Sequence, residues 1–218
     1  RDSISSDDDI QRLTTNLFKN TTPKGSQTQD PFWDQTAAML LKALVCYLHY
    51  EAPPDEQNFS MVMRVLEYAE VKEEDEEYIS PLDLLFQAME RENPGSVAVR
   101  QYKVFKMAAG KTSKSILVST AVRLAPFNLP QIQAITDHDD MELYTLGEKK
   151  AALYAVIPDN DNTFNFLVSL LYSQAFQTLY YSADQIHHGA LPRHVHFVLD
   201  EFAAMPLPGF TRELATMR

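Results

Sequence analysis

The sequence predicts a mostly α-helical chain that ends in a small layer of strands and helices. Two observations carry this fold class. Residues 30–125 contain successive segments whose apolar residues recur every three or four positions, which is the period of amphipathic helices. Residues 149–201 then contain two short apolar runs on either side of a long aromatic-rich helix. This order is expected for a strand, a crossover helix and a parallel second strand.

The first helix is expected to begin after Ser6, a residue type that often caps helices. The three aspartates at 7–9 suit the positive end of the helix dipole. One apolar face follows, made of Ile10, Leu13, Leu17 and Phe18. The polar, turn-rich stretch at 20–29 ends this helix and is the first candidate domain boundary.

Start and stop signals divide the next part of the chain into further helices. An N-cap residue followed by proline occurs at 30–31 and again at 80–81, and Asn58 is a third cap. The prolines at 53–54 and the Asn-Pro-Gly at 93–95 predict helix ends. This block is therefore expected to be all-helical.

Two polar stretches within the helical block invite functional interpretations. Residues 70–77 carry six carboxylates, which predicts a solvated acidic loop, with a docking surface for a basic partner as the alternative. Residues 108–115 read AAGKTSKS and contain the Gly-Lys-Thr of a phosphate-binding loop. The full motif needs a second glycine at the place of Phe105 and a preceding strand. Gly110 is instead interpreted as a left-handed helix stop and Thr112 as the next cap.

Composition excludes several classes of function. The chain has 19 Lys and Arg against 30 Asp and Glu, giving a net charge of -11, and no basic groove is visible to attract nucleic acid. The single cysteine, Cys46, lies in an apolar run and is expected to be buried. No apolar run approaches the roughly 20 residues of a spanning helix, so the segment is expected to be soluble.

The strongest local signal is VHFVLDEF at 195–202, where an apolar run ends in Asp200 and Glu201. In P-loop ATPases a buried strand delivers an aspartate to the Mg²⁺ shell, and the next glutamate polarises the attacking water. Capping of a following helix would select the same two residue types, so the motif alone leaves both interpretations open.

Three stretches together resemble a known family. They read DPFWDQTAAMLLKALVCYL, LYAVIPDNDNTFNFLVSLLYSQAF and LPRHVHFVLDEFAAMPLPGFTRELATMR. These are similar to the coupling ATPases of conjugative type IV secretion systems, the TraG/TraD-type DNA transfer family, in the form carried by Gram-positive mobile elements. The similarity covers nearly the whole chain. Its most diagnostic part is the continuation of LDEFA into a proline-rich turn and LATMR.

The resemblance implies an all-α domain inserted in a partial RecA-like α/β (P-loop) nucleotide-binding domain. Residues 1–28 would be an edge helix and linker of the nucleotide-binding domain, 29–141 the all-α cargo-recognition domain, and 142–218 the remaining nucleotide-binding part with the Walker B strand. Asp200 would hold Mg²⁺ of Mg-ATP through water, and Glu201 would be the catalytic glutamate.

The resemblance also implies partners and a location. The full-length protein would be a membrane-anchored homohexamer on the cytoplasmic face that recruits the relaxase–DNA complex and drives transfer with ATP. This sequence lacks a Walker A motif, so we expect the segment alone to be cytoplasmic, inactive and without bound ATP or Mg²⁺. We expect the segment to serve partner recognition and to bind DNA weakly or not at all. It could exist as a monomer. The alternative is a free-standing helical adaptor without an ATPase role.

Two groups of possible metal ligands are interpreted as structural. His194 and His196 alternate on one predicted strand, but the sequence places no third ligand beside them. Residues 137–142 collect carboxylates without the glycine and spacing of a calcium loop, which favours a solvated domain junction. The residues at 187–189 are expected to form a turn after the long helix.

Overall fold

The structure is a computed structural model that describes residues 4, 6–21, 31–72, 75, 77–108, 110–157, 163–200, 202, 207 and 210–216. These residues form two compact units. The helical unit contains the described residues between 6 and 139 except 19–21, and the C-terminal unit contains residue 4, residues 19–21 and those from 140 onward. The domain boundaries at 28/29 and 141/142 rest on the family resemblance and stay a prediction.

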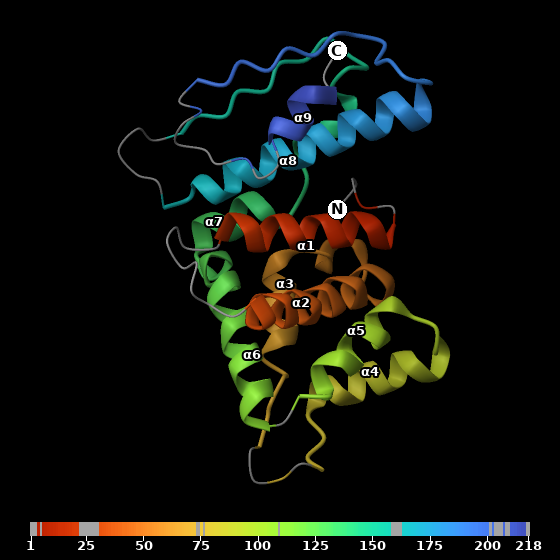
Figure 1. The fold of residues 1–218 in the computed structure, drawn as a ribbon, viewed down its shortest axis with the longest axis vertical. Coiled ribbons are helices and arrows are strands. Elements are labelled where there is room, and N and C mark those ends of the chain that lie inside the picture. The colour runs from red at the N-terminus through yellow and green to blue at the C-terminus, as the bar shows by residue number, and fades with distance from the viewer. Residues whose placement is uncertain are drawn as a thin grey trace. The chain divides into compact units, whose positions relative to one another are not determined.

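The described residues of the helical unit are mostly helical (Figure 1). In chain order its helical elements are α1 (Asp7–Thr21), α2 (Pro31–Glu51), the 3-10 turn η1 (Pro54–Glu56), α3 (Phe59–Leu66), α4 (Pro81–Glu92), α5 (Val97–Lys106), α6 (Gly110–Leu124), the 3-10 turn η2 (Ala125–Asn128) and α7 (Pro130–Thr136). A mostly helical chain is thereby confirmed.

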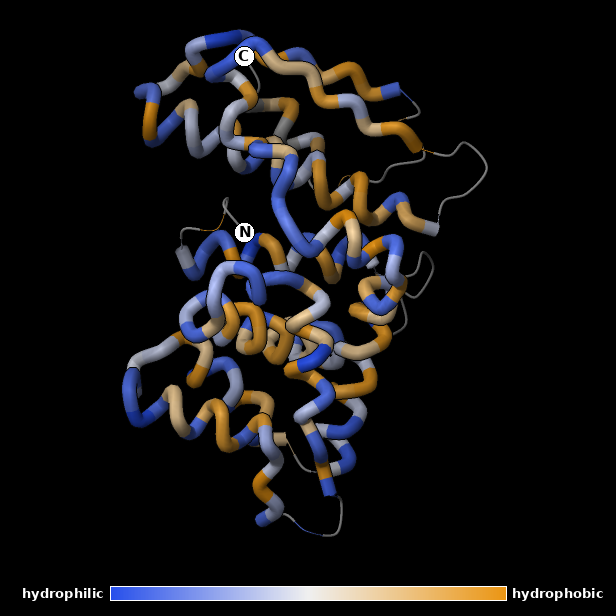
Figure 2. The backbone as a smooth tube through the Cα atoms, turned by 180° about the vertical axis from the view of Figure 1, so that it is seen from behind, coloured by the Kyte–Doolittle hydropathy of each residue, from blue (hydrophilic) through white to orange (hydrophobic). Residues whose placement is uncertain are grey.

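Helix α2 is the centre of the helical unit, where it packs against α3, α5 and α6. Its residues Leu40, Leu41 and Leu44 are fully buried. Two aromatic pairs tie the surrounding elements together, with ring centroids 4.0 Å apart for Phe86 and Tyr102 and 4.3 Å apart for Phe59 and Phe127. Figure 2 shows hydrophobic segments along these helices. Burial of this apolar surface is the main stabilising contribution to the unit.

The caps predicted at Asn58 and Ser80 form as expected. The Asn58 side chain accepts a hydrogen bond from the Met61 N–H at 2.9 Å, and α2 begins at Pro31. Ser80 and Asp83 form a reciprocal capping box at the start of α4. Asp30, the cap predicted before Pro31, lies outside the described residues. Short-range cap chemistry thus sets where these helices begin.

The corner between α5 and α6 differs in detail from the prediction. It is a turn between two helices, as expected, but Gly110 is the first residue of α6 and is not left-handed. The chain turns earlier, where the Ala108 N–H bonds to the Phe105 carbonyl at 3.1 Å. This tight turn makes a left-handed stop unnecessary, so Thr112 lies inside α6 instead of capping it.

The C-terminal unit contains one long helix and two extended segments. Its helical elements are the 3-10 turn η3 (Leu143–Thr145), α8 (Asn165–Tyr181), the π-helical turn η4 (Ser182–Ile186) and α9 (Phe210–Thr216). The first extended segment is 151–157 and the second is 193–199. In Figure 1 both run in the same direction, and α8 returns the chain between them.

The prediction of two buried strands is not met in the described residues. They contain no strand ladder, only an isolated bridge between Leu146 and Lys149. The side chains of Val156 and Val198 are 94% and 86% exposed. A buried parallel strand needs paired neighbours and a covering layer on both faces, and α8 is the helix that packs on the second segment here. The two extended segments are connected through α8 as in a crossover unit, but their side chains are not buried as expected for strands of such a unit.

None of the helices in the described ranges is both long enough and apolar enough to cross a bilayer.

Candidate functional site

Asp200 lies directly after the second extended segment, in a turn of the chain. Its side chain is exposed to solvent. The two segments run in the same direction (Figure 1). Along the chain, Ile157 ends the first segment and Asp200 directly follows the second. Carboxylates at the carboxyl ends of parallel segments are common in ligand sites of α/β proteins. Glu201, the predicted catalytic glutamate, lies outside the described residues.

Aromatic contacts hold the chain on both sides of Asp200. Before it, the Phe197 ring packs on Phe176 of α8 with centroids 4.5 Å apart. After it, Phe202 packs on Phe210 of α9 at 4.7 Å, and Phe210 reaches the same Phe176 at 5.9 Å. The turn that carries Asp200 is therefore bounded by two side chains anchored on one aromatic cluster.

A hollow of about 1170 Å³ lies between the two extended segments and α8. Its walls include Tyr154 and Val156 from the first segment, His196 and Val198 from the second, and Tyr172 from α8. Much of this lining is apolar, as the sequence of both segments requires. The hollow marks the place where the predicted strands would otherwise pack against each other.

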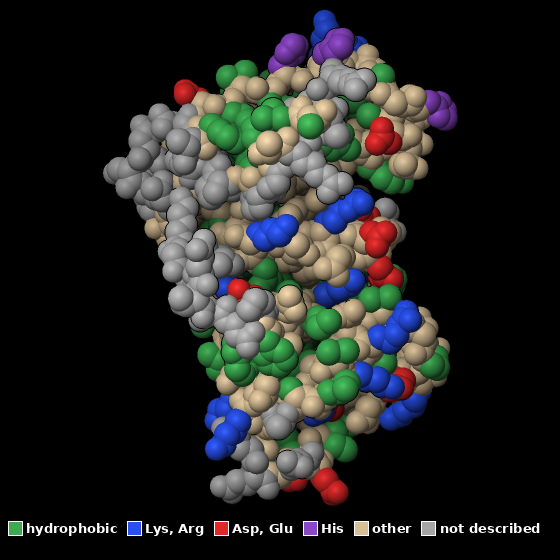
Figure 3. All heavy atoms as spheres, viewed as in Figure 1, with side chains coloured by type: hydrophobic (Ala, Val, Ile, Leu, Met, Phe, Trp, Pro, Cys, Tyr) green, Lys and Arg blue, Asp and Glu red, His purple; other side chains and the backbone are tan. Residues whose placement is uncertain are grey.

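The alternative metal sites find no support in the described residues. His194 and His196 are both exposed, and no group of three or more His, Cys, Asp or Glu within the described ranges is placed to hold a metal ion. Figure 3 shows histidine side chains at the surface of the face in view. The histidine pair therefore remains without a third ligand in this part of the chain.

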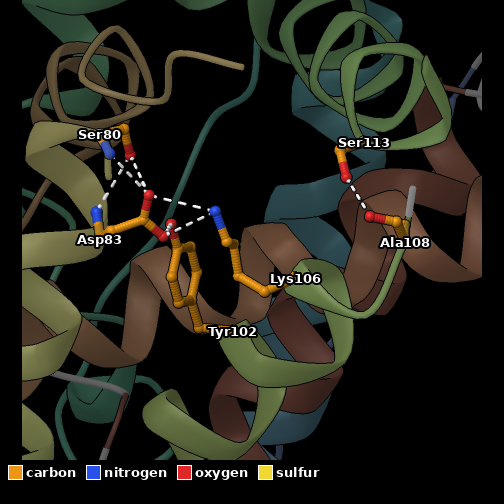
Figure 4. Close-up of polar contacts among 6 residues, drawn as sticks. All are labelled: Ser80, Asp83, Tyr102, Lys106, Ala108 and Ser113. Atoms are coloured by element: carbon orange, nitrogen blue, oxygen red, sulfur yellow. Dashed lines mark hydrogen bonds and ion pairs between the residues drawn. The ribbon is translucent and has the colours of Figure 1, made fainter. Parts of the chain in front are cut away.

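The helical unit contains a buried polar cluster that links α4 to α5 (Figure 4). The Asp83 carboxylate accepts hydrogen bonds from the Ser80 N–H and hydroxyl, both at 2.8 Å, and from the Tyr102 hydroxyl at 2.9 Å. Lys106 pairs with it at 3.0 Å. Burial by itself would raise the pKa of Asp83, but these donors outweigh it and hold the pKa below its ordinary value.

The neighbours of Asp83 are affected in turn. Burial and then the Asp83 charge raise the pKa of Tyr102, which keeps its hydroxyl protonated as a donor. Every polar atom of the carboxylate has a partner, so the cluster is a structural link between two helices and offers no open position for a substrate. Cys46 is also unsuited to chemistry, because burial and the nearby Asp7 charge raise its pKa to about 12.

A smaller hollow of about 350 Å³ lies beside this cluster. It is lined by Glu70, Lys72 and Asp75 from the acidic stretch and by Lys106 and Met107 from the end of α5. Met107 is strongly exposed. Figure 3 shows lysine and arginine side chains separated by acidic and apolar ones on the face in view. A mixed surface of this kind is suited to a protein partner more than to a phosphate backbone.

The sequence draws attention to Asp200 but gives no signal of the residues that pack around it. Asp200 was visible from its position after an apolar run. Phe210 gave no signal, because its partner Phe176 is 34 residues away and only the fold brings the rings together. The contacts of Tyr102 and Lys106 with Asp83, 19 and 23 residues apart, are equally invisible in a local pattern.

Comparison with known protein families gives a match over the whole chain. The family model described as type IV secretory system conjugative DNA transfer matches residues 1–218. No curated protein and no solved structure matches the chain.

Proposed function

The chain belongs to the type IV secretory system conjugative DNA transfer family, and from this premise we propose that it is part of a coupling ATPase. In this proposal the full-length protein recruits a relaxase–DNA substrate to the secretion channel and drives its transfer with ATP. The protein acts as a homohexamer on the cytoplasmic face of the membrane. The form carried by Gram-positive mobile elements is the member of the family that the three quoted stretches resemble.

The position of Asp200 is the single observation that carries the ATPase part of the proposal. An apolar segment, a crossover helix and a parallel second segment deliver this carboxylate to the turn after the second segment. That is the place where P-loop ATPases carry the Mg²⁺-associated aspartate. The aromatic anchors on either side support the interpretation, because a metal-associated carboxylate needs a fixed backbone.

The residues fit Mg-ATP in chemical type. Asp200 presents a solvent-facing carboxylate, and hard oxygen ligands of this kind are those that Mg²⁺ prefers, often through retained water. Bound Mg²⁺ would neutralise charge that develops on the transferred phosphoryl group. Asp200 would orient the hydrated cation and Glu201 would hold and orient the attacking water. The phosphate loop is expected from a part of the protein other than residues 1–218, which contain no G-x-x-x-x-G-K-[ST] motif.

The helical unit is proposed as the partner-recognition part. Its hollow beside residues 70–75 combines carboxylates, lysines and the exposed Met107, a composition typical of protein interfaces. The net charge of -11 opposes unassisted DNA binding. Both the composition of the hollow and the negative net charge support recognition of the relaxase protein, to which the transferred DNA is bound, over direct recognition of DNA.

The ATPase part is tested in the full-length protein with Asp200→Asn and Glu201→Gln. We expect each variant to lower the ATPase kcat about 100-fold or more, and to lower conjugative transfer in a strain that lacks the wild-type gene. Asp184→Asn is the control, because Asp184 is an exposed carboxylate of the same unit. Wild-type kcat in Asp200→Asn would overturn the assignment.

The recognition part is tested with the 218-residue chain. A titration against the relaxase and accessory proteins of the same element is run beside labelled single-stranded DNA at physiological salt. We expect saturable protein binding and no DNA binding up to about 10 µM, since non-specific affinity at this salt depends on neutralised phosphates. Tight binding of DNA alone would instead favour a role in the translocation channel. Absence of both would favour the helical adaptor.

A further inference from the structure

Glu148 connects three parts of the C-terminal unit at the start of the first extended segment. Its Oε1 atom lies 2.5 Å from His187 Nε2 and 3.2 Å from the Ser182 hydroxyl, and both groups donate to it. Its backbone carbonyl accepts from Arg193 Nε at 3.3 Å. One residue therefore meets the end of α8, the turn that follows it and the first residue of the second segment.

The backbone next to Glu148 strengthens the same connection. The Arg193 N–H donates to the Gly147 carbonyl at 3.0 Å, so the start of the second segment is hydrogen-bonded to the chain four residues before the first segment. Gly147 has φ +86°, and a Cβ on it would meet the Leu191 side chain at 3.2 Å. A side chain at position 147 would thus be strained in its backbone and crowded by the second segment. Glycine permits the close approach.

The π-helical turn explains how His187 reaches Glu148. After α8 the chain widens into η4 and the His187 N–H bonds to the Ser182 carbonyl at 3.0 Å. His188 and Gly189 then take positive φ values of 57° and 113°, which turns the chain toward the second segment. Ser182 is buried, so its hydroxyl needs the partner that Glu148 supplies. A π-helical turn in a helix often accompanies a functional constraint.

We propose that Gly147, Glu148, Ser182, His187 and Arg193 form a register joint, which fixes the alignment of the two extended segments and thereby the position of Asp200. Within the described residues no ladder of backbone hydrogen bonds sets this alignment further along the segments. The aromatic cluster holds the far end, and the joint holds the near end. The catalytic consequence rests on the proposed ATPase function.

The effect of a slip can be stated in distances. A strand advances about 3.3 Å per residue and alternates its faces, so a shift of one residue moves Asp200 by about 3.3 Å and turns Phe197 away from Phe176. A displacement of about 1 Å already costs on the order of 100-fold in rate for some enzymes. Glu148 and its partners are accordingly positioning residues, each at least seven residues from Asp200 along the chain.

The test compares Glu148→Ala with Glu148→Gln, because the Gln amide oxygen can still accept from His187 and Ser182 while the Ala methyl cannot. His187→Gln and His187→Ala form a second pair, since the Gln amide nitrogen can replace the imidazole donor. Gln185→Ala is the control, being an exposed residue of the same turn. Amide hydrogen exchange is measured in the 218-residue chain, and ATPase kcat and KM are measured in the full-length protein.

We expect both Ala variants to speed exchange of the Arg193 amide, which donates to the Gly147 carbonyl, about fivefold or more while the helical unit is unchanged, and to lower kcat about tenfold with little change in KM. Both Gln variants should recover most of each loss. Unchanged exchange in Glu148→Ala overturns the joint. Faster exchange with normal kcat in an active protein overturns its positioning role.

These outcomes are distinguishable from failure of the proposed function. A full-length wild-type protein without ATPase activity would refute the ATPase proposal alone. In that case the exchange data on the 218-residue chain would still decide whether the joint aligns the two segments.

Discussion

At the scale of single residues, the Asp83 cluster shows how a charge is accommodated inside the helical unit (Figure 4). The carboxylate is buried, yet five contacts from three other residues reach it. A buried charge without partners would be strongly destabilising, whereas a fully hydrogen-bonded one specifies which helices meet. Ser80 supplies the contacts that are local in sequence, and Tyr102 and Lys106 of α5 supply the long-range contacts, called here the long-range half of the cluster.

Tyr102→Phe tests the long-range half. The substitution removes the hydroxyl that donates to Asp83 and keeps the ring stacked on Phe86. We expect a loss of about 1.5–3 kcal/mol in the free energy of unfolding, as for hydrogen bonds to charged groups. Urea unfolding followed by circular dichroism measures it. Tyr154→Phe is the matched control, because Tyr154 is 86% exposed. Equal effects of the two substitutions would contradict the assigned role of the hydroxyl.

The pH dependence of stability tests the charge itself. The folded pKa of Asp83 is lowered, so its stabilising contribution is complete above the ordinary carboxyl pKa of about 3.9 and is lost as the pH falls below it. We expect Asp83→Asn to be less stable than wild type at pH 7, with the difference narrowing from pH 5 to pH 3. Urea midpoints at these pH values measure the trend. A difference that widens toward pH 3 would reverse the sign and refute the argument.

At the scale of elements, the helices could be predicted because their signals are local. Caps at Asn58 and Ser80 and prolines at 31 and 81 lie next to the ends that they determine. The Gly110 prediction was wrong for a related reason. Glycine permits a left-handed stop but does not require one, and the chain had already turned at Ala108.

The extended segments could be predicted only in part. Apolar runs at 149–158 and 195–199 gave their places and their direction, since a crossover helix links parallel elements. Their burial depends on neighbours, which a local pattern does not contain. The supports of Asp200, namely Phe176, Phe210 and Glu148, are distant in sequence and emerge only in the fold. Glu201 lies outside the described residues, so its predicted role stays a prediction.

The two faces of the second segment should respond differently to substitution. Phe197 packs on Phe176 and Tyr172, whereas Val198 is 86% exposed. In the 218-residue chain we expect Phe197→Ala to cost about 2 kcal/mol and Val198→Lys less than about 0.5 kcal/mol. Urea unfolding measures both.

The same Val198→Lys substitution should abolish transfer in the full-length protein if a further layer covers the segment there, as the family resemblance implies. A large cost for Val198→Lys in the 218-residue chain would mean that this side chain is already packed. The comparison of the two proteins separates these cases.

At the scale of the whole molecule, stability is expected to be unevenly distributed between the two units. The helical unit contains most of the buried apolar side chains, with α2 at its centre. The extended segments of the C-terminal unit have exposed side chains and no ladder in the described residues. Local opening is easiest where few apolar contacts are broken.

Amide hydrogen exchange should reveal this difference directly. We expect amides in the middle of α2 to exchange at least about 100-fold more slowly than those at 151–157, because α2 amides open only with the unit as a whole. Exchange at 194–199 should be intermediate, since Phe197 and the register joint restrain that segment. Equal protection across 151–157 and α2 would show that the first segment is paired in solution.

The buried Cys46 has a practical consequence for measuring such motions. It is the one cysteine in the sequence, it is fully buried, and its pKa is raised to about 12. Thiol reagents react with the thiolate, so the Cys46 sulfur should be unreactive toward them in the folded chain. A fluorophore or spin label could therefore be attached to one cysteine introduced on either unit, with the native residue left in place. Two introduced cysteines, one on each unit, would then allow the distance between the units to be measured without a cysteine-free background.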